Sequence, residues 1–144
     1  MVHVSRTVTV PLPRDEAFRR VADFGRAAEW DPGLSESRQA TSGEPGLGTQ
    51  FAIVAEFRGK ATPMTYEITE WEPTTRMVIT GTGEKATARD EIVFADAAGG
   101  GTDITYSAAL GLTGVLKVAE PFLKGTFNSM ADHAVAGLAS WLGG

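Results

Sequence analysis

Apolar and polar residues alternate along the first ten positions of the chain. Valine stands at positions 2, 4, 8 and 10, whereas serine and threonine stand at positions 5, 7 and 9. A period of two residues is typical of a strand with one buried face. The pattern therefore predicts a first strand over residues 2–10.

The segment after this strand has the end signals of a helix. Pro13 suits the first helical position, and two acidic residues follow it where the helix dipole favours negative charge. The next apolar residues share one face, and Gly25 is a stop signal. We expect a helix over residues 13–23 and a second short helix over 26–30.

Six further strands are expected between residues 34 and 111, because alternating segments are separated there by clusters of turn-forming residues. The alternation weakens only in the segment 34–42. The residues expected to face inward are Phe51, Ile53, Ala55 and Phe57; Met64, Tyr66 and Ile68; Met77 and Ile79; Ile92 and Phe94; and Ile104, Tyr106, Ala108 and Leu110.

After Gly114 the apolar period becomes helical, which predicts a C-terminal helix of about 25 residues. Pro121 implies that this helix bends there or begins there. Glu120 falls on the apolar face, which is explained if the helix starts after it or if it faces a polar cavity. The predicted apolar face comprises Leu116, Leu123, Phe127, Met130, Ala131, Ala134, Leu138 and Trp141.

These elements predict one α+β domain over residues 1–144. The apolar face of a seven-stranded antiparallel sheet needs a cover, and only the C-terminal helix is long enough to provide it. A curved sheet wrapped around one helix leaves space at the wider end of the groove. We therefore expect a cavity between the sheet and the helix.

Composition narrows the classes of function. The chain has 42% hydrophobic and 22% charged residues, which is typical of a globular protein. The net charge is −5 with scattered basic residues, so no nucleic-acid partner is expected. Cysteine is absent, which excludes thiol catalysis and disulfides. No apolar stretch is long enough for stable membrane insertion, and no signal-peptide pattern occurs, so a cytoplasmic location is expected.

Two acidic residues stand at alternate strand positions that predict an inward-facing side chain. Asp90 aligns with Ile92, and Glu70 aligns with Tyr66. A carboxyl group buried in the cavity would have a raised pKa, which suits general acid or base catalysis. The alternative is that the strand ends reach solvent and both acids are surface residues.

The two tyrosines, Tyr66 and Tyr106, are candidates for ligand contact or catalysis, or they are core residues bonded to backbone groups. Trp30 either covers the cavity or fixes the second short helix to the sheet. His3 and His133 have no partner at metal-ligand spacing, so no metal and no cofactor are expected.

Several short motifs carry a resemblance that covers nearly the whole chain. The element order and these motifs resemble the START-like helix-grip superfamily, in particular its polyketide cyclase/dehydrase and lipid-transport branch. The resemblance implies a hydrophobic cavity for lipids, polyketides or similar molecules. The motifs are residues 8–18, 30–33 (WDPG), 46–51 (GLGTQF), 68–73 (ITEWEP), 100–106 (GGTDITY) and 120–123 (EPFL).

Three functions are compatible with this sequence. The first is binding of a hydrophobic small molecule, the second is a cyclase, aromatase or dehydratase that acts on a polyketide, and the third is a protein-interaction module. The oligomeric state is left open. The expected ligand-binding residues are Trp30 near the mouth, with Phe51, Ile53, Tyr66, Ile79, Tyr106, Leu123, Phe127 and Met130 along the walls.

Overall fold

Seven strands form one antiparallel sheet in the computed structural model, which describes residues 1–143. Gly144, the last residue of the predicted domain, lies outside the described residues. The strand order is β1-β7-β6-β5-β4-β3-β2. The elements are β1 (Val2–Val10), α1 (Arg14–Ala22), η1 (Phe24–Glu29), β2 (Leu34–Gln39), β3 (Gln50–Phe57), β4 (Lys60–Glu72), β5 (Arg76–Thr82), β6 (Ala86–Asp96), η2 (Ala98–Gly100), β7 (Thr102–Leu112), η3 (Gly114–Phe122) and α2 (Lys124–Trp141).

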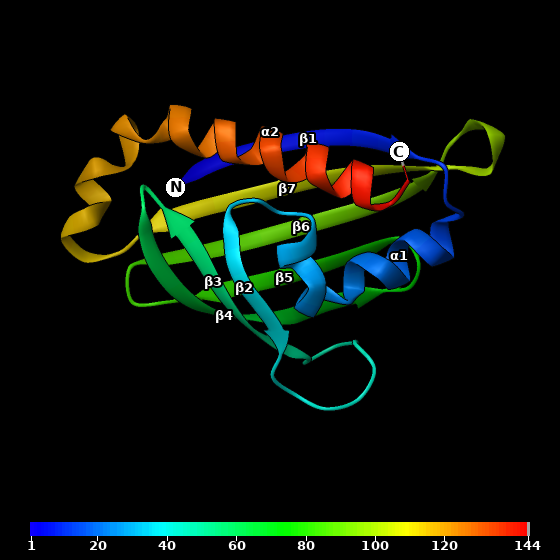
Figure 1. Cartoon of the computed structure of the whole chain (residues 1–144), viewed down its shortest axis with the longest axis horizontal. Coiled ribbons are helices and arrows are strands. Elements are labelled where there is room, and N and C mark those ends of the chain that lie inside the picture. The colour runs from blue at the N-terminus through cyan, green and yellow to red at the C-terminus, as the bar shows by residue number, and fades with distance from the viewer. Residues whose placement is uncertain (144) are drawn as a thin grey trace.

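The α+β architecture and the helix-grip arrangement expected from the sequence are confirmed. The sheet curls, and α2 runs along its concave side in contact with β1 (Figure 1). The first short helix is the α-helix α1, and the second is the 3-10 helix η1. Alternate residues of β3, such as Phe51 and Ile53, are fully buried, as the period of two predicts.

One end of α2 is pressed against the segment that follows η1. A β-carbon added at Gly137 would clash with the carbonyl oxygen of Trp30, so the two backbones meet there without any side chain between them. Leu138 and Leu142 lie in the core at the same end, with 0% and 1% of their surface exposed. This end of the groove is therefore closed.

The other end of α2 differs from the sequence prediction. The α-helix has 18 residues rather than about 25, because η3 precedes it as a 3-10 helix that contains Pro121. Proline lacks the N–H of a regular helix and restricts the residue before it. Glu120 precedes the α-helix, in agreement with the explanation that the helix starts after this residue. Its carboxylate accepts a hydrogen bond from the Leu112 N–H at 2.9 Å. No helix within residues 1–143 is long and apolar enough to cross a membrane.

Replacing Gly137 by Ala tests the contact at the closed end. We predict that Gly137→Ala destabilises the protein by about 1–3 kcal/mol, because the new methyl group meets backbone that cannot rotate away. Denaturant unfolding measures this change. Gly125→Ala is the matched control in the same helix, because a β-carbon there meets open space and should stabilise by up to ~1 kcal/mol. Equal changes in the free energy of unfolding for Gly137→Ala and Gly125→Ala would contradict the close contact between α2 and the Trp30 backbone.

Candidate functional site

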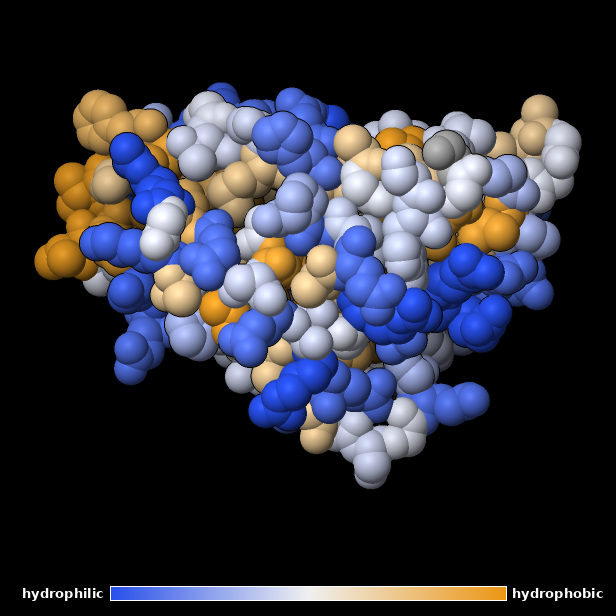
Figure 2. Space-filling model, viewed as in Figure 1, coloured by the Kyte–Doolittle hydropathy of each residue, from blue (hydrophilic) through white to orange (hydrophobic). Residues whose placement is uncertain are grey.

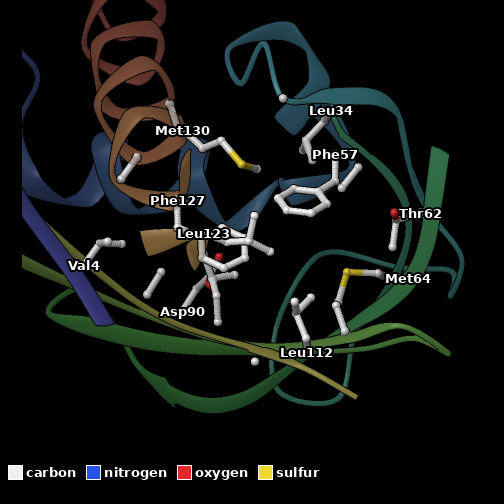
Figure 3. Close-up of a pocket in the computed structure, with 18 of the residues that line it drawn as sticks. Val4, Leu34, Phe57, Thr62, Met64, Asp90, Leu112, Leu123, Phe127 and Met130 are labelled. Atoms are coloured by element: carbon white, nitrogen blue, oxygen red, sulfur yellow. The ribbon is translucent and has the colours of Figure 1, made fainter. Parts of the chain in front are cut away.

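A cavity of about 590 Å³ lies between the sheet and the N-terminal half of α2. Ligand pockets in proteins usually measure about 300–1,000 Å³. Figure 3 shows Phe127 and Met130 of α2 with Leu123 on one side, and Phe57, Met64 and Leu112 of the strands on the other. The Phe57 and Phe127 rings stack at 5.4 Å between centroids. Most of the cavity wall is therefore apolar.

Asp90 and Tyr106 form a hydrogen-bonded pair deep in this cavity. They stand on the neighbouring strands β6 and β7, where Asp90 pairs with Ala108 and Tyr106 pairs with Ile92. This diagonal relation brings the two side chains together on the same face of the sheet. The Tyr106 hydroxyl donates to Asp90 Oδ2 at 2.5 Å, and Asp90 is only 7% exposed.

Burial raises the pKa of Asp90 to about 7. The hydrogen bond from Tyr106 opposes this rise, and the neighbouring Asp31 carboxylate adds to it. Burial also raises the pKa of Tyr106, and the charge on Asp90 acts in the same direction. Near neutral pH, Asp90 is thus present in both protonation states, as a general acid or base must be.

Tyr66 enters the cluster from β4. Its ring lies flat on the backbone of Gly81 in β5, where any β-carbon would collide with it. The ring also packs on Phe24 at 5.5 Å between centroids. Burial raises the pKa of Tyr66, with smaller contributions from the charges on Asp90 and Asp31. Among residues 1–143, no group hydrogen-bonds its hydroxyl, which leaves that O–H free for a ligand.

Asp31, which the sequence analysis names only within the WDPG motif, is also a member of the cluster. Its Oδ1 accepts the Gly33 N–H at 2.8 Å, while burial raises its pKa. The adjacent Trp30 ring lies 6.3 Å from that of Tyr106, so the turn sits opposite β7. The signal available in the sequence was the Asp-Pro-Gly turn within the WDPG motif.

Arg6 also lines the cavity and was missed. It occupies the one even position in the middle of the first strand where valine is absent, which is the signal that could have revealed it. Its guanidinium donates to Asp132 at 2.6 Å and to Asn128 at 3.1 Å, both on α2. Arg6 therefore joins β1 to α2 and is already paired.

The structure separates the predicted ligand-binding residues into two groups. Tyr66, Tyr106, Leu123, Phe127 and Met130 line the cavity, as does the catalytic candidate Asp90. Their contact with a ligand stays a prediction. Four others do not line this cavity: they are buried in the packed core, and the Trp30 carbonyl meets Gly137 at the closed end. These four are Trp30, Phe51, Ile53 and Ile79.

Glu70 does not face the cavity, contrary to the parity prediction. The pairing of β4 with β5 shifts between Ile68 and Glu70, so a bulge inserts one extra residue and reverses the side on which Glu70 points. The Glu70 carboxylate lies on the outer face and pairs with Arg76 at 2.7 Å and Arg89 at 3.1 Å. The geometry gives it no access to a bound ligand.

The curled sheet, the C-terminal helix and the cavity between them define a START-like helix-grip protein. Solved structures with this fold cover 97% of the chain. They include a Thermus thermophilus protein with 17% identity and a TM-score of 0.81, aligned over 96% of that chain. The Zhui aromatase/cyclase of Streptomyces sp. R1128 has 14% identity and a TM-score of 0.80 over 92% of its chain.

Sequence comparison then gives the family. Residues 1–142 match the family described as polyketide cyclase / dehydrase and lipid transport, and the chain belongs to that family. An uncharacterized protein of Mycobacterium tuberculosis is 26% identical over 137 residues, which are 95% of this chain and 90% of the relative. The recognition made from the sequence motifs is thus confirmed.

The buried acids predict an unusual pH dependence of stability. A carboxyl whose pKa is raised on folding stabilises the native state below its unfolded pKa, near 4, and loses this contribution as the pH rises to its folded pKa. For Asp90 that window runs from about 4 to about 7.

We therefore expect the free energy of unfolding to fall by an amount on the order of 1–4 kcal/mol between pH 4 and 7. Asp90→Asn should remove most of this fall and leave the smaller part that comes from Asp31. Tyr106→Phe should extend the fall above pH 7, because it removes the hydrogen bond that lowers the pKa of Asp90. Urea unfolding at a series of pH values measures the free energy of unfolding of the wild type and of both variants. Parallel pH curves for the three proteins would contradict the raised pKa of Asp90.

Proposed function

We propose that this protein binds an elongated hydrophobic molecule that ends in a neutral polar group. The observation that carries this proposal is the division of the cavity into an apolar wall and a polar deep end. Membership in a family described by polyketide cyclase, dehydrase and lipid-transport functions supports the same class of ligand.

The chemistry of the deep end favours a neutral head group. Asp31 and Asp90 are acids. Of the cations that line the cavity, Arg58, Lys60 and Lys85 stand at the hairpin ends around its mouth, and Arg6 already binds Asp132. An anionic head group would therefore meet like charges in a poorly solvated space. A carbonyl or hydroxyl would instead accept a hydrogen bond from the free Tyr66 O–H.

A pair of ligands that differ only in head-group charge tests this preference. We expect the methyl ester of cis-parinaric acid to bind at least ~10-fold more tightly than the free acid at pH 8, because both cavity acids repel a carboxylate. Fluorescence titration measures both affinities. Asp90→Asn should narrow the difference. A preference of the wild-type protein for the free acid would refute the neutral-head proposal.

A blocking substitution tests whether the cavity is the binding site. Ala108 lies inside the cavity, and its neighbour Ala109 points to the other side of β7. We predict that Ala108→Phe lowers the affinity for the methyl ester at least ~10-fold by occupying its space, and that Ala109→Phe leaves it within about 2-fold. Equal binding by both variants would place the ligand elsewhere. Native mass spectrometry of protein purified without denaturant would then identify any ligand carried from the cell.

A second candidate function is acid–base catalysis by the Asp90–Tyr106 pair. The observation that favours it is the buried carboxyl with a pKa of about 7 in hydrogen-bond contact with a phenol. Asp90 as carboxylate could remove a proton from the carbon between two carbonyls of a poly-β-ketone, and Tyr106 could donate to the developing enolate oxygen.

A poly-β-ketone thioester substrate tests this second function. We expect the wild-type protein to accelerate its cyclisation with a rate that rises through a pKa near 7, and Asp90→Asn to lower the rate ~10²-fold or more. Glu70→Gln, on the outer face, is the control that should leave the rate unchanged. Tight binding of the thioester with no acceleration would leave binding as the function and exclude catalysis.

A further inference from the structure

Exposed apolar side chains gather on η3, at the open end of the cavity. Val115, Val118 and Phe122 are 89%, 78% and 85% exposed, although large apolar residues elsewhere in the chain are mostly buried. Leu116 and Ala119 of the same element line the cavity. Figure 2 shows hydrophobic residues concentrated at this end of the molecule with hydrophilic residues beside them.

The chain contains four lysines, and all four surround this same end. Lys60 and Lys85 line the cavity mouth, Lys117 lies on η3 and Lys124 begins α2. All four are exposed, and none lies within ion-pair distance of a carboxylate among residues 1–143. The arginines, by contrast, take part in most of the ion pairs of the protein.

This end is basic although the chain as a whole has a net charge of −5. Arg58 adds to the four lysines, and Glu56 and Glu84 are the acids on the adjoining hairpins. Glu120 is buried and paired with the amino group of Met1 at 2.9 Å. The charge asymmetry would orient the molecule with the cavity mouth toward an anionic surface.

We propose that the cavity mouth docks peripherally on an anionic lipid membrane, with the apolar side chains of η3 inserted among the head groups. Apolar residues flanked by lysines are the pattern of interfacial segments that bind anionic bilayers. Protein–protein interfaces are instead depleted in lysine and enriched in Arg, Tyr and Trp, so an acidic protein fits this surface less well.

Docking in this position would place the open end of the cavity at the boundary between the head groups and the hydrocarbon of the bilayer. A hydrophobic ligand could then move between membrane and cavity without crossing water, which would otherwise oppose its transfer. This transfer rests on the proposed binding function, whereas docking itself does not.

Vesicle sedimentation with the full chain and no added ligand tests the docking. We expect binding to phosphatidylcholine vesicles that contain about 30% phosphatidylglycerol, with weakening in high salt, and at least ~10-fold weaker binding to pure phosphatidylcholine. Lys117→Glu/Lys124→Glu and Val118→Asp/Phe122→Asp should each lower binding to the anionic vesicles at least ~10-fold. These side chains are exposed, so circular dichroism should show both variants folded.

Matched controls carry the same chemical changes away from the mouth. Arg19→Glu/Arg38→Glu makes the same change in net charge, and Leu47→Asp replaces another exposed apolar residue, 68% exposed. Both should bind within about 2-fold of the wild type. Equal losses in the controls and the η3 variants would overturn the proposal. Failure of the wild-type protein to bind anionic vesicles would also overturn the proposal. In that case an acidic protein would be the partner that fits this surface.

Uptake of the parinaric methyl ester from solution separates the two proposals. The η3 variants should bind this probe as the wild type does, because their substituted side chains lie outside the cavity. If the wild-type protein binds the methyl ester but not the anionic vesicles, the docking proposal is wrong and the proposed binding function stands. If the vesicles bind and the probe does not, the proposed binding function fails and docking stands.

Discussion

The contact of Gly137 with the Trp30 carbonyl determines where this fold is solid and where it is hollow. At that point α2 approaches the segment after η1 as closely as two backbones can, and Leu138 and Leu142 complete a packed core beside it. The sheet continues past this contact toward the β3–β4 hairpin, and α2 gives way to the looser η3. The space between them widens in that direction, and the cavity is the result.

The boundary between core and cavity is marked by four ionisable side chains. Tyr66 and Asp90 are buried, Asp31 and Tyr106 are half-buried, and burial raises the pKa of each. A core without function would gain stability by replacing such acids with apolar residues, because desolvating them is unfavourable without a cationic partner. Their position where an apolar cavity ends is the physical reason to assign them to ligand recognition or proton transfer.

The alternation of apolar residues was sufficient to predict the strands and the face on which Tyr66, Asp90 and Tyr106 stand. It could not predict the level along a strand at which the core ends, because that level depends on how α2 crosses the sheet. Phe51, Ile53 and Ile79 share the inward face that alternation predicts, but the structure buries them in the core, outside the lining of the cavity. The bulge in β4 turns the Glu70 side chain to the outer face of the sheet. No glycine or proline at this position indicates the bulge in the sequence. Asp31 was missed because an Asp-Pro-Gly turn has a sufficient local explanation.

Asp90 is buried beside Tyr106, and within residues 1–143 no cation lies at ion-pair distance to compensate its charge. The most direct measurement is a pH titration of the Asp90 side-chain carboxyl carbon by NMR in the ligand-free protein, assigned with Asp90→Asn. We predict a midpoint of about 7, moved higher in Tyr106→Phe. A midpoint near 4, the value of a solvated aspartate, that Tyr106→Phe leaves unchanged would contradict the account.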